Sequence, residues 1–468
     1  MNRPLTLPHS TKPASDRALL TVRVLFFVKM LLVIPFGVIS STLVLYTTHK
    51  LNLSDLSAIN LIALFLGCTG ILRITIGYIA GLHLSYRQLL LFSPLFMMIG
   101  CLLATFPSYL YIGISFVALG SASTIAVNCL LTTLFKNDNL KRETVFLRNY
   151  SGMNIGYLTA FFLSGYYTIY QDYQRLFMIT SIICLLGWVI IVVNWQQLKL
   201  EHNNVPNQTF LKQLITLLGI MLMPFLLSKL MQNIVINKTY FFVINLILFM
   251  LISAFVMKKS NKPLQNKLGL FFIFVVPVLI FATLQNLTPT LLTLFIERQV
   301  DRHFFIFTIP PQWVGLVNIT AIIIGGHLLS YLFKWLREKG VDINPALQFS
   351  VGLIAMGASL FIVVIGILLS RSLVSIHWVI VSSLLQGISE LLIVPIGFSI
   401  IAKIASPDTQ GLMMGCWLLL LSIGALLSGY LSKIITQLDS HLFLLGSLSV
   451  SVGMIIILFY KLELSSSV

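Results

Sequence analysis

The sequence contains long apolar stretches that carry no charged side chain. Two examples run from residue 176 to 198 and from 343 to 370. Because a helix rises about 1.5 Å per residue, each stretch is long enough to cross the hydrocarbon core of a bilayer, which is about 30 Å thick. Similar stretches recur along most of the chain, so we predict a helical protein that crosses a membrane many times.

The composition excludes a soluble protein. Of the 468 residues, 57% are hydrophobic and only 9% are charged, whereas soluble domains carry roughly 25% charged residues. The net charge of +16 would suggest a nucleic-acid partner in a soluble chain, but in a membrane protein basic residues gather in cytoplasmic loops. We therefore expect a lipid bilayer around the protein and no nucleic-acid partner.

Charged clusters and Pro, Asn and Gly residues divide the apolar sequence into predicted membrane spans. The first six lie near residues 20 to 46, 56 to 81, 86 to 106, 108 to 134, 147 to 170 and 175 to 197. After a polar linker, two further spans lie near 211 to 232 and 239 to 257. Six more lie near 268 to 296, 311 to 335, 346 to 370, 373 to 402, 410 to 436 and 441 to 460, which makes about fourteen.

Six spans, an inserted pair and another six are the arrangement of the major facilitator architecture, in which two bundles are related by an axis along the membrane normal. We therefore predict an all-α integral membrane protein with two six-helix bundles and a two-helix insertion. The expected units are a tail of residues 1–19, an N-terminal bundle of 20–200, a linker with the inserted helices of 201–267, a C-terminal bundle of 268–461 and a tail of 462–468.

Lysine and arginine are distributed unequally between the two predicted faces. Most of them fall in loops on the same side as the N-terminus, while Lys238 and Arg298 are among the few on the other side. Because basic residues resist translocation, we expect both termini in the cytoplasm and a multi-pass protein of the cell's inner (plasma) membrane. We expect the protein to be a monomer.

Glu390 is the only carboxylate well inside a predicted span. A buried acid is costly in lipid, and such groups usually mark a pathway for a substrate, an ion or a proton. We therefore predict that Glu390 faces a polar cavity, where it binds a cation or a proton. The alternative is a neutral carboxyl group that is hydrogen-bonded between helices.

Two basic residues also lie within spans, Lys29 in the first and Arg73 in the second. If both face the cavity of Glu390, the N-terminal half offers cations and the C-terminal half an anion. This polarity suits a zwitterion whose carboxylate and ammonium are separated. The alternative, above all for Lys29, is a side chain that extends to the cytoplasmic headgroups.

Several neutral side chains are weaker candidates. Tyr150 and Asn154 are four residues apart and share a helix face, where they could bind a ligand or hold helices together. Trp417 on the span after Glu390 could wall a cavity, although tryptophan more often packs at an interface. His327 is a lone histidine in a span, and such a residue is more often a satisfied polar group than a proton relay.

Other functional classes lack the motifs that they need. There is no GxxxxGK[ST] loop for ATP, and there is no interfacial cluster of His, Asp and Glu of the kind that a membrane-embedded enzyme for lipids or isoprenoids would require. The five cysteines lie far apart within predicted spans. We therefore expect a transporter rather than an enzyme, with no metal and no cofactor.

Residues 384–430, "LLQGISELLIVPIGFSIIAKIASPDTQGLMMGCWLLLLSIGALLSGY", resemble the tenth and eleventh spans of the proton-dependent oligopeptide transporter family, a branch of the major facilitator superfamily. The resemblance implies that Glu390 contacts the amino group of a peptide and that Trp417 lines the pocket. "QNLTPTLLTLFIERQV" (285–300) and "IPPQWVGLVN" (309–318) resemble the family's seventh and eighth spans, and the latter places Asn318 at a pocket position. "NYSGMNIG" (149–156) resembles the fifth span and assigns Tyr150 and Asn154 to the pocket.

The N-terminal half departs from that family in its charged motifs. The first-span "ExxER" motif that couples protons is replaced, in an ungapped register, by Lys29, Leu32 and Val33. The fourth-span lysine that binds the peptide carboxylate falls at Ile125, and the aspartate that closes the second span falls at Gly81. Arg73 and Lys29 are candidates to replace the lost positive charge.

We therefore expect a secondary active transporter that takes up di- or tripeptides, or a similar small zwitterion, with protons and by alternating access. Glu390 would bind the ammonium and carry the proton, Arg73 and Lys29 would bind the carboxylate, and Tyr150, Asn154, Asn318 and Trp417 would shape the pocket. The alternative is a major facilitator transporter of another solute, such as an amino acid, a siderophore-like metabolite or a drug, without proton coupling.

Overall fold

The computed structural model describes residues 14–466 except 136–138, 200–209, 260–261, 263–264, 266–268, 270–271, 305–306, 340–343, 405–409 and 436–437. Residues 1–13 and 467–468 of the predicted tails lie outside the described residues. The unit boundaries predicted at 200/201 and 267/268 also lie outside them.

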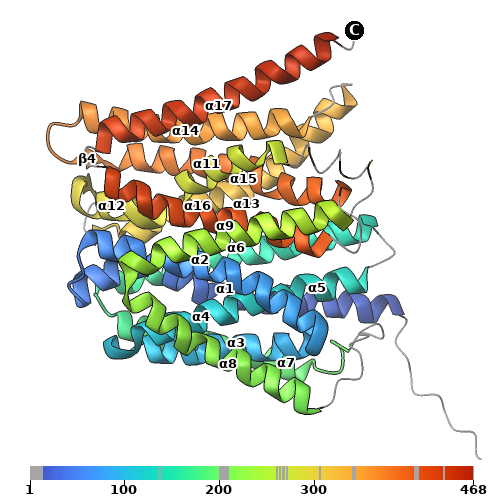
Figure 1. Cartoon of the computed structure of the whole chain (residues 1–468). Helices are drawn as coiled ribbons and strands as arrows, with labels where there is room; N and C mark the ends of the chain where they lie inside the picture. Colours follow the sequence, from blue (N-terminus) through green and yellow to red (C-terminus); the bar gives the residue numbers. More distant parts are fainter. Residues whose placement is uncertain are drawn as a thin grey trace, which may run out of the picture.

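Long helices that run roughly side by side make up almost the whole structure (Figure 1). The N-terminal bundle consists of α1 (Ala14–Lys50), α2 (Asp55–His83), α3 (Tyr86–Ala104), a short 3₁₀ turn η1 (Pro107–Tyr109) that leads into α4 (Leu110–Ser123) and α5 (Ile125–Leu134), α6 (Asn139–Ile169) and α7 (Tyr173–Val193). The inserted pair is α8 (Phe210–Gln232) and α9 (Ile234–Lys259).

The C-terminal bundle begins with a broken span. This span consists of α11 (Val275–Gln285), the π-helix η2 (Thr288–Leu292) and α12 (Thr293–Gln299). The other helices are α13 (Pro311–Glu338), α14 (Pro345–Leu369), α15 (Ile376–Ile404), α16 (Gln410–Ile434) and α17 (Leu438–Ser466).

Four strands of two residues each, which we did not predict, add to the helical fold. β1 (Val300–Asp301) pairs in parallel with β4 (Val374–Ser375), so that Val300 lies opposite Val374. β2 (His303–Phe304) pairs in antiparallel fashion with β3 (Phe307–Thr308). They arise because the segments that leave α12 and enter α15 satisfy backbone hydrogen bonds with each other where no helix supplies them.

The helices have the length and composition of membrane spans. Among the described residues, 13 helical stretches are long and apolar enough to cross a membrane. The further long helix is α6, which carries Lys141, Arg142 and Arg148 near its start and packs against α1 and α13. The prediction of about fourteen spans in two bundles with an inserted pair is therefore confirmed.

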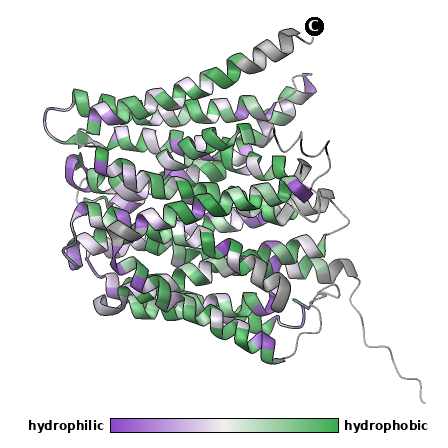
Figure 2. Cartoon of the chain, in the orientation of Figure 1, coloured by the Kyte–Doolittle hydropathy of each residue, from purple (hydrophilic) through white to green (hydrophobic). Residues whose placement is uncertain are grey.

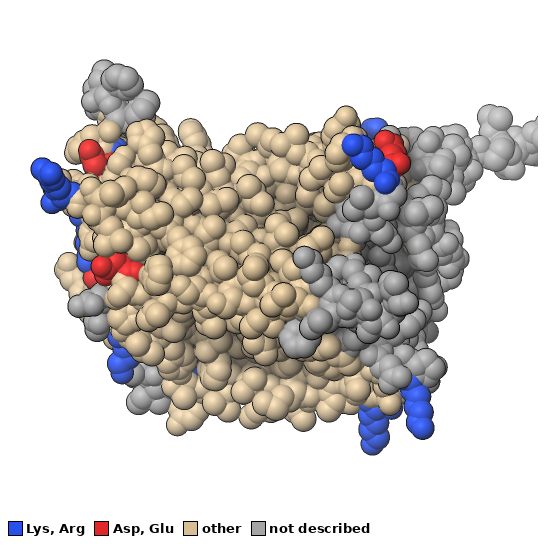
Figure 3. All heavy atoms as spheres, turned by 90° about the horizontal axis from the view of Figure 1, so that it is seen from above, with Lys and Arg blue, Asp and Glu red and all other residues tan. Residues whose placement is uncertain are grey.

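Charged side chains gather at the two ends of the helices. Apolar residues dominate between these ends (Figure 2), and the face seen in Figure 3 shows a broad uncharged belt between two charged rims. We call the end where α1 ends and α2 begins the Asp55 face, which lies at the left in Figure 1, and the opposite end the N-terminal face.

Each bundle has its own apolar core. The N-terminal core includes the buried side chains of Leu25, Phe65 and Phe96. The C-terminal core includes those of Phe281 and Phe349. The two bundles also pack directly on each other along a seam, because Leu426 of α16 joins the N-terminal core and a Cβ atom at Gly67 of α2 would lie 2.7 Å from it.

The inserted helix α9 connects the two bundles, because it packs against α2 of one and α16 of the other. The sequence placed Lys238 in an external loop, and this expectation is wrong: the residue lies in α9 and is only 4% exposed. Its ammonium donates to Asn60 Oδ1 on α2 at 2.7 Å and to the Gly429 carbonyl on α16 at 3.3 Å. It also lies 3.9 Å from the centre of the Tyr430 ring, where a cation is attracted to the aromatic face.

We predict that Lys238→Met destabilises the folded protein. The substitution leaves Asn60 Oδ1 buried without its donor, and an unmade buried hydrogen bond costs about 1–3 kcal/mol. Differential scanning fluorimetry in detergent should show a lower unfolding temperature than for Lys229→Met, because Lys229 on the neighbouring helix α8 is exposed. Equal unfolding temperatures for the two variants would show that Lys238 contributes nothing to the stability of this junction.

Candidate functional site

Glu390 lies on α15 and faces the broken seventh span. Gln285, the last residue of α11, donates from Nε2 to Glu390 Oε2 at 2.7 Å. Among the described residues, no lysine, arginine or histidine forms an ion pair with Glu390. The carboxyl group is therefore held by a neutral amide and remains available to a mobile cation.

The seventh span is interrupted directly beside this contact. Pro289 has no amide hydrogen to donate to the Gln285 carbonyl four residues earlier, and the helix widens into η2, where the Leu292 amide bonds to the Leu287 carbonyl at 2.9 Å. Single π-helical turns and broken transmembrane helices occur frequently at functional sites. The break thus places irregular backbone next to the intramembrane acid.

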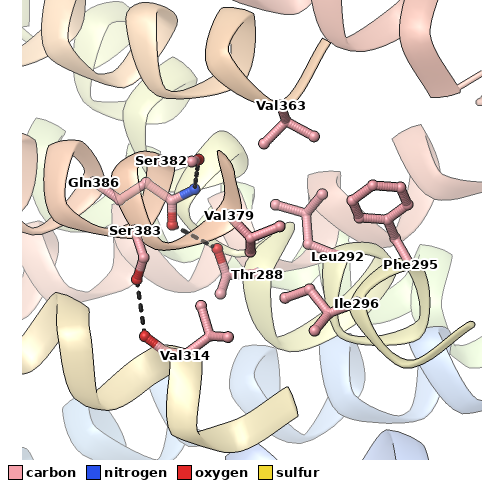
Figure 4. Close-up of a pocket in the computed structure, with 10 residues that line it drawn as sticks. All are labelled: Thr288, Leu292, Phe295, Ile296, Val314, Val363, Val379, Ser382, Ser383 and Gln386. Carbon is pink, nitrogen blue, oxygen red and sulfur yellow. Dashed lines mark hydrogen bonds between the residues drawn. The ribbon is translucent and has the colours of Figure 1, made fainter. Parts of the chain in front are cut away.

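A column of polar side chains continues along α15 away from Glu390. Gln386 accepts from Thr288 Oγ1 at 2.8 Å and donates to Ser382 Oγ at 3.4 Å. These residues and Ser383 line a cavity of about 10 Å³ (Figure 4), which is room for about one water molecule. The interior of the C-terminal bundle is therefore polar over more than one turn next to the acid.

The two predicted cations lie in the interior of the N-terminal half. Lys29 on α1 is 8% exposed and donates to Thr124 Oγ1 at 3.2 Å, at the break between α4 and α5. Arg73 on α2 is half-buried, and its guanidinium lies 5.7 Å from the centre of the Phe36 ring. Lys29 therefore does not extend to the headgroups, and the charges of Lys29 and Arg73 act on each other.

Two tyrosines on α6, Tyr150 and Tyr157, lie near Glu390, and Tyr157 also lies near Arg73. The charge of Glu390 acts on both Tyr150 and Tyr157, and the charge of Arg73 acts on Tyr157. Asn154 lies between them and turns its amide back to the Tyr150 carbonyl at 3.0 Å. Tyr157 on α6 thus lies within electrostatic reach of both Arg73 on α2 and Glu390 on α15.

Asn318 and Trp417 differ in their position relative to Glu390. Asn318 lies on α13 where α15 crosses it closely, because a Cβ atom at Gly387 would lie 2.6 Å from the Asn318 carbonyl oxygen. Gly387 is less than one turn from Glu390, so Asn318 belongs to the same level. Trp417 is 1% exposed and packs on Gly397, about two turns from Glu390, with Phe349 and Phe398 around it. The structure does not bring Trp417 to the acid, and its role in the pocket stays a prediction.

Sequence reasoning missed Gln285 and Tyr157. Gln285 lies in an apolar run next to a proline, and a polar residue at a helix break is a signal that could have found it. Tyr157 follows Tyr150 by seven residues and therefore lies on the same helix face. His327, in contrast, is exposed, and within the described part of the chain its ring bonds to its own helix at the Ile323 carbonyl.

Ion pairs join the two bundles at the Asp55 face. Arg298 on α12 binds Asp55 on α2 with both guanidinium branches, at 2.5 and 2.8 Å. His49 at the end of α1 contacts Glu297 Oε1 at 2.8 Å. Between Asp55, Arg298 and Lys433 lies a cavity of about 370 Å³ that opens to this face. The Asp55–Arg298 pair therefore lines this cavity.

The helices α6 and α13 also close the seam toward the Asp55 face. Trp313 Nε1 donates to the Phe162 carbonyl at 3.1 Å, and the Trp313 and Phe162 rings stack with centres 5.7 Å apart. Gln312 donates to Thr168 Oγ1 at 2.9 Å. These hydrogen bonds and ion pairs between the two bundles lie in the half of the molecule toward the Asp55 face. The bundles are therefore locked together toward the Asp55 face.

Comparison with known proteins links the chain to one family. The family model of the POT family matches residues 74–448. The chain is 23% identical to the dipeptide and tripeptide permease A of Salmonella typhimurium over 404 residues, which are 83% of this chain and 79% of that protein. It is 24% identical to the dipeptide and tripeptide permease B of Aliivibrio fischeri over 378 residues, with coverage of 76% and 74%.

Solved structures share the fold. A peptide transporter POT in complex with sulfate superposes with a TM-score of 0.84 at 17% identity, over 96% of this chain and 98% of that chain. A POT family transporter in complex with 5-aminolevulinic acid gives a TM-score of 0.83 at 18% identity, over 94% and 95%. These similarities confirm the predicted arrangement of helices.

We predict that charge reversal opens the Asp55 face. Asp55→Arg places two guanidinium groups side by side, and their repulsion should separate α2 from α12. Spin labels at the ends of these helices should report a longer mean distance by pulsed electron paramagnetic resonance than in the parent protein. The double variant Asp55→Arg/Arg298→Asp should restore the parental distance, and a distance that is unchanged in the single variant would contradict the assigned lock.

Proposed function

Because the chain belongs to the POT family, we propose that it is a secondary transporter that takes up di- and tripeptides together with protons. Two of its relatives are named as dipeptide and tripeptide permeases. The observation that carries the proposal is the carboxyl group of Glu390, which is held by the neutral amide of Gln285 and forms no ion pair among the described residues. Arg73 lies on the opposite bundle, and both charges reach Tyr157. A peptide has the complementary pair of charges.

We propose that the Asp55 face is extracellular and that both termini are cytoplasmic. The basic loops favour this orientation, because lysine and arginine accumulate on the cytoplasmic side. The conformation is then closed toward the outside by the Asp55–Arg298 and His49–Glu297 contacts. Transport proceeds by alternating access, with residues 20–200 and 268–461 as the two rocking units of a monomer.

The amino end of the substrate binds at Glu390. A protonated amine is a strong hydrogen-bond donor. A carboxylate attracts it far more strongly in a site of low dielectric than the same two groups attract each other in bulk water. The same carboxyl group is the site of the coupled proton, because no fixed cation compensates its charge among the described residues.

The carboxyl end of the substrate binds at Arg73 and Lys29. Lys29 donates to Thr124, which directly precedes Ile125, the position where the resembled family has its carboxylate-binding lysine. The first span thus supplies a positive charge at the level where the fourth span has lost one. Arg73 adds a planar guanidinium, which matches the geometry of a carboxylate.

The side chains of Tyr150, Asn154 and Asn318 form the walls between these two charged ends. Tyr150 and Asn154 come from α6, and Asn318 comes from α13, which α6 contacts across the seam. Trp417 packs against α15 at Gly397.

A small zwitterion other than a peptide would meet the same charges, so the second candidate is a transporter of an amino acid or a related solute. Competition by dialanine in an uptake assay separates the two.

We predict that Glu390→Gln abolishes accumulation of dialanine in proteoliposomes under an inward proton gradient. The amide cannot take up the proton, so the gradient no longer drives net uptake, whereas exchange of internal for external peptide persists. Radiolabelled dialanine with and without a gradient measures both activities. Gradient-driven accumulation that equals that of the parent protein would remove Glu390 as the proton site.

We predict that Lys29→Met raises the half-saturating concentration of dialanine about tenfold or more, since a hydrogen bond to a charged group contributes about 1.5–3 kcal/mol. Ile125→Lys in the same chain should restore part of the loss, because it returns an ammonium to the region of Thr124. Lys229→Met is the matched control and should transport like the parent protein. Failure of the second substitution to recover any affinity would argue against a shared carboxylate site.

A further inference from the structure

Within the described residues, the side-chain amide of Gln285 forms a hydrogen bond through its nitrogen but not through its oxygen. Its Nε2 donates to Glu390 Oε2 at 2.7 Å. Its Oε1 is buried and accepts no hydrogen bond from the part of the chain that the structure describes. A buried amide oxygen without a donor is unfavourable by about 1–3 kcal/mol. Gln285 Oε1, beside the intramembrane carboxyl group of Glu390, can therefore accept a hydrogen bond from a ligand.

The orientation of the amide determines which kind of group is missing. Because the amide nitrogen donates to the carboxyl oxygen, the amide atom left without a partner beside Glu390 is the oxygen Oε1, which is an acceptor. The carboxylate of Glu390 likewise offers only acceptor oxygens. A primary ammonium has three N–H donors and no acceptor, so it complements this pair. An anion, or a group that only accepts hydrogen bonds, does not complement these acceptor oxygens.

The backbone supports the same conclusion. Gln285 ends α11 just before the turn and the π-helix η2. Because Pro289 cannot donate to the Gln285 carbonyl, the last turn of α11 is freed from the regular helix, as in the broken helices that surround transporter sites. The side chain therefore comes from a part of the span that can adjust when a ligand enters.

We propose that Gln285 Oε1 and the carboxylate of Glu390 jointly bind the substrate ammonium, and that Gln285 determines the preference for a free amino terminus. This inference rests on the proposed peptide transport. Gln285 has two tasks in it: it fixes the Glu390 carboxylate through its nitrogen and receives one ammonium hydrogen through its oxygen. A substrate with an acylated amino group can use neither acceptor fully, because its nitrogen carries a single hydrogen and no charge.

The test compares dialanine with N-acetyl-dialanine as competitors of radiolabelled dialanine uptake into proteoliposomes. Gln285→Met keeps the volume of the side chain but removes both amide groups. We expect its half-inhibiting concentration for dialanine to rise about tenfold or more, while that for N-acetyl-dialanine changes by less than about twofold. The preference for the free amine over the blocked one therefore collapses.

Gln386→Met is the matched control. Gln386 is a buried glutamine one turn from Glu390, but both its oxygen and its nitrogen are engaged, by Thr288 and Ser382. We expect this variant to keep the parental preference for the free amine. An equal loss of preference in both variants would show that disturbance of the polar column is the cause, and it would overturn the role of Gln285.

Gln285→Glu keeps the inference testable if Gln285→Met does not fold. In this variant a protonated carboxyl group can donate to its neighbour as the amide does, and a free acceptor oxygen remains. We expect the preference for the free amine to be retained, and its loss would overturn the inference. Absence of dialanine uptake by the parent protein would instead reject peptide transport itself, so the two failures are distinguishable.

Discussion

The carboxyl group of Glu390 must be solvated by the protein, because lipid cannot solvate it. The surrounding helices meet this requirement without a salt bridge: the amide of Gln285 donates to one oxygen, and the cations at Arg73 and Lys29 remain across the seam. A fixed ion pair would satisfy the acid permanently and leave nothing for a ligand to supply. A partly satisfied acid opposite partly satisfied cations is unstable alone and stabilised by a zwitterion between them.

The rest of the architecture keeps this group at the boundary of two bodies. Most of each apolar core belongs to one bundle, and the polar side chains of Arg73, Tyr157 and Glu390 lie where helices of the two bundles meet. Toward the Asp55 face the seam is closed by single polar contacts that can break and re-form, namely the Asp55–Arg298 ion pair and the hydrogen bond from Trp313 to Phe162. Exposed ion pairs of this kind contribute little to stability, which suits a closure that has to open repeatedly.

Much of the fold could be predicted from the sequence, because apolar length and charge position determine where helices cross a bilayer. The span of α6 was predicted although its first part is charged, since its apolar remainder has the necessary length. The location of Lys238 could not be predicted. Its partners Asn60 and Gly429 are far away in sequence, and only the packing of α9 between α2 and α16 brings them to the lysine.

The site was predictable where charge made residues conspicuous. Glu390, Arg73 and Lys29 stood out because charged groups in spans are rare, and the structure places all three toward the interior. Gln285 and Tyr157 did not stand out, because neutral polar residues also serve helix packing. Their importance comes from the residues that lie opposite them, and this depends on the break in the seventh span and on the packing of α6 against α1 and α13.

The contact of Lys238 has a consequence for how the two bundles can move. One ammonium group bonds to α2 and α16 at the same time, so these helices cannot part at that level without first releasing the lysine. If the contact is preserved, the two bundles can only rotate relative to each other about an axis that passes near Lys238. The inserted pair then fixes where the axis of rotation passes, and the largest excursions fall on the helix ends farthest from α9.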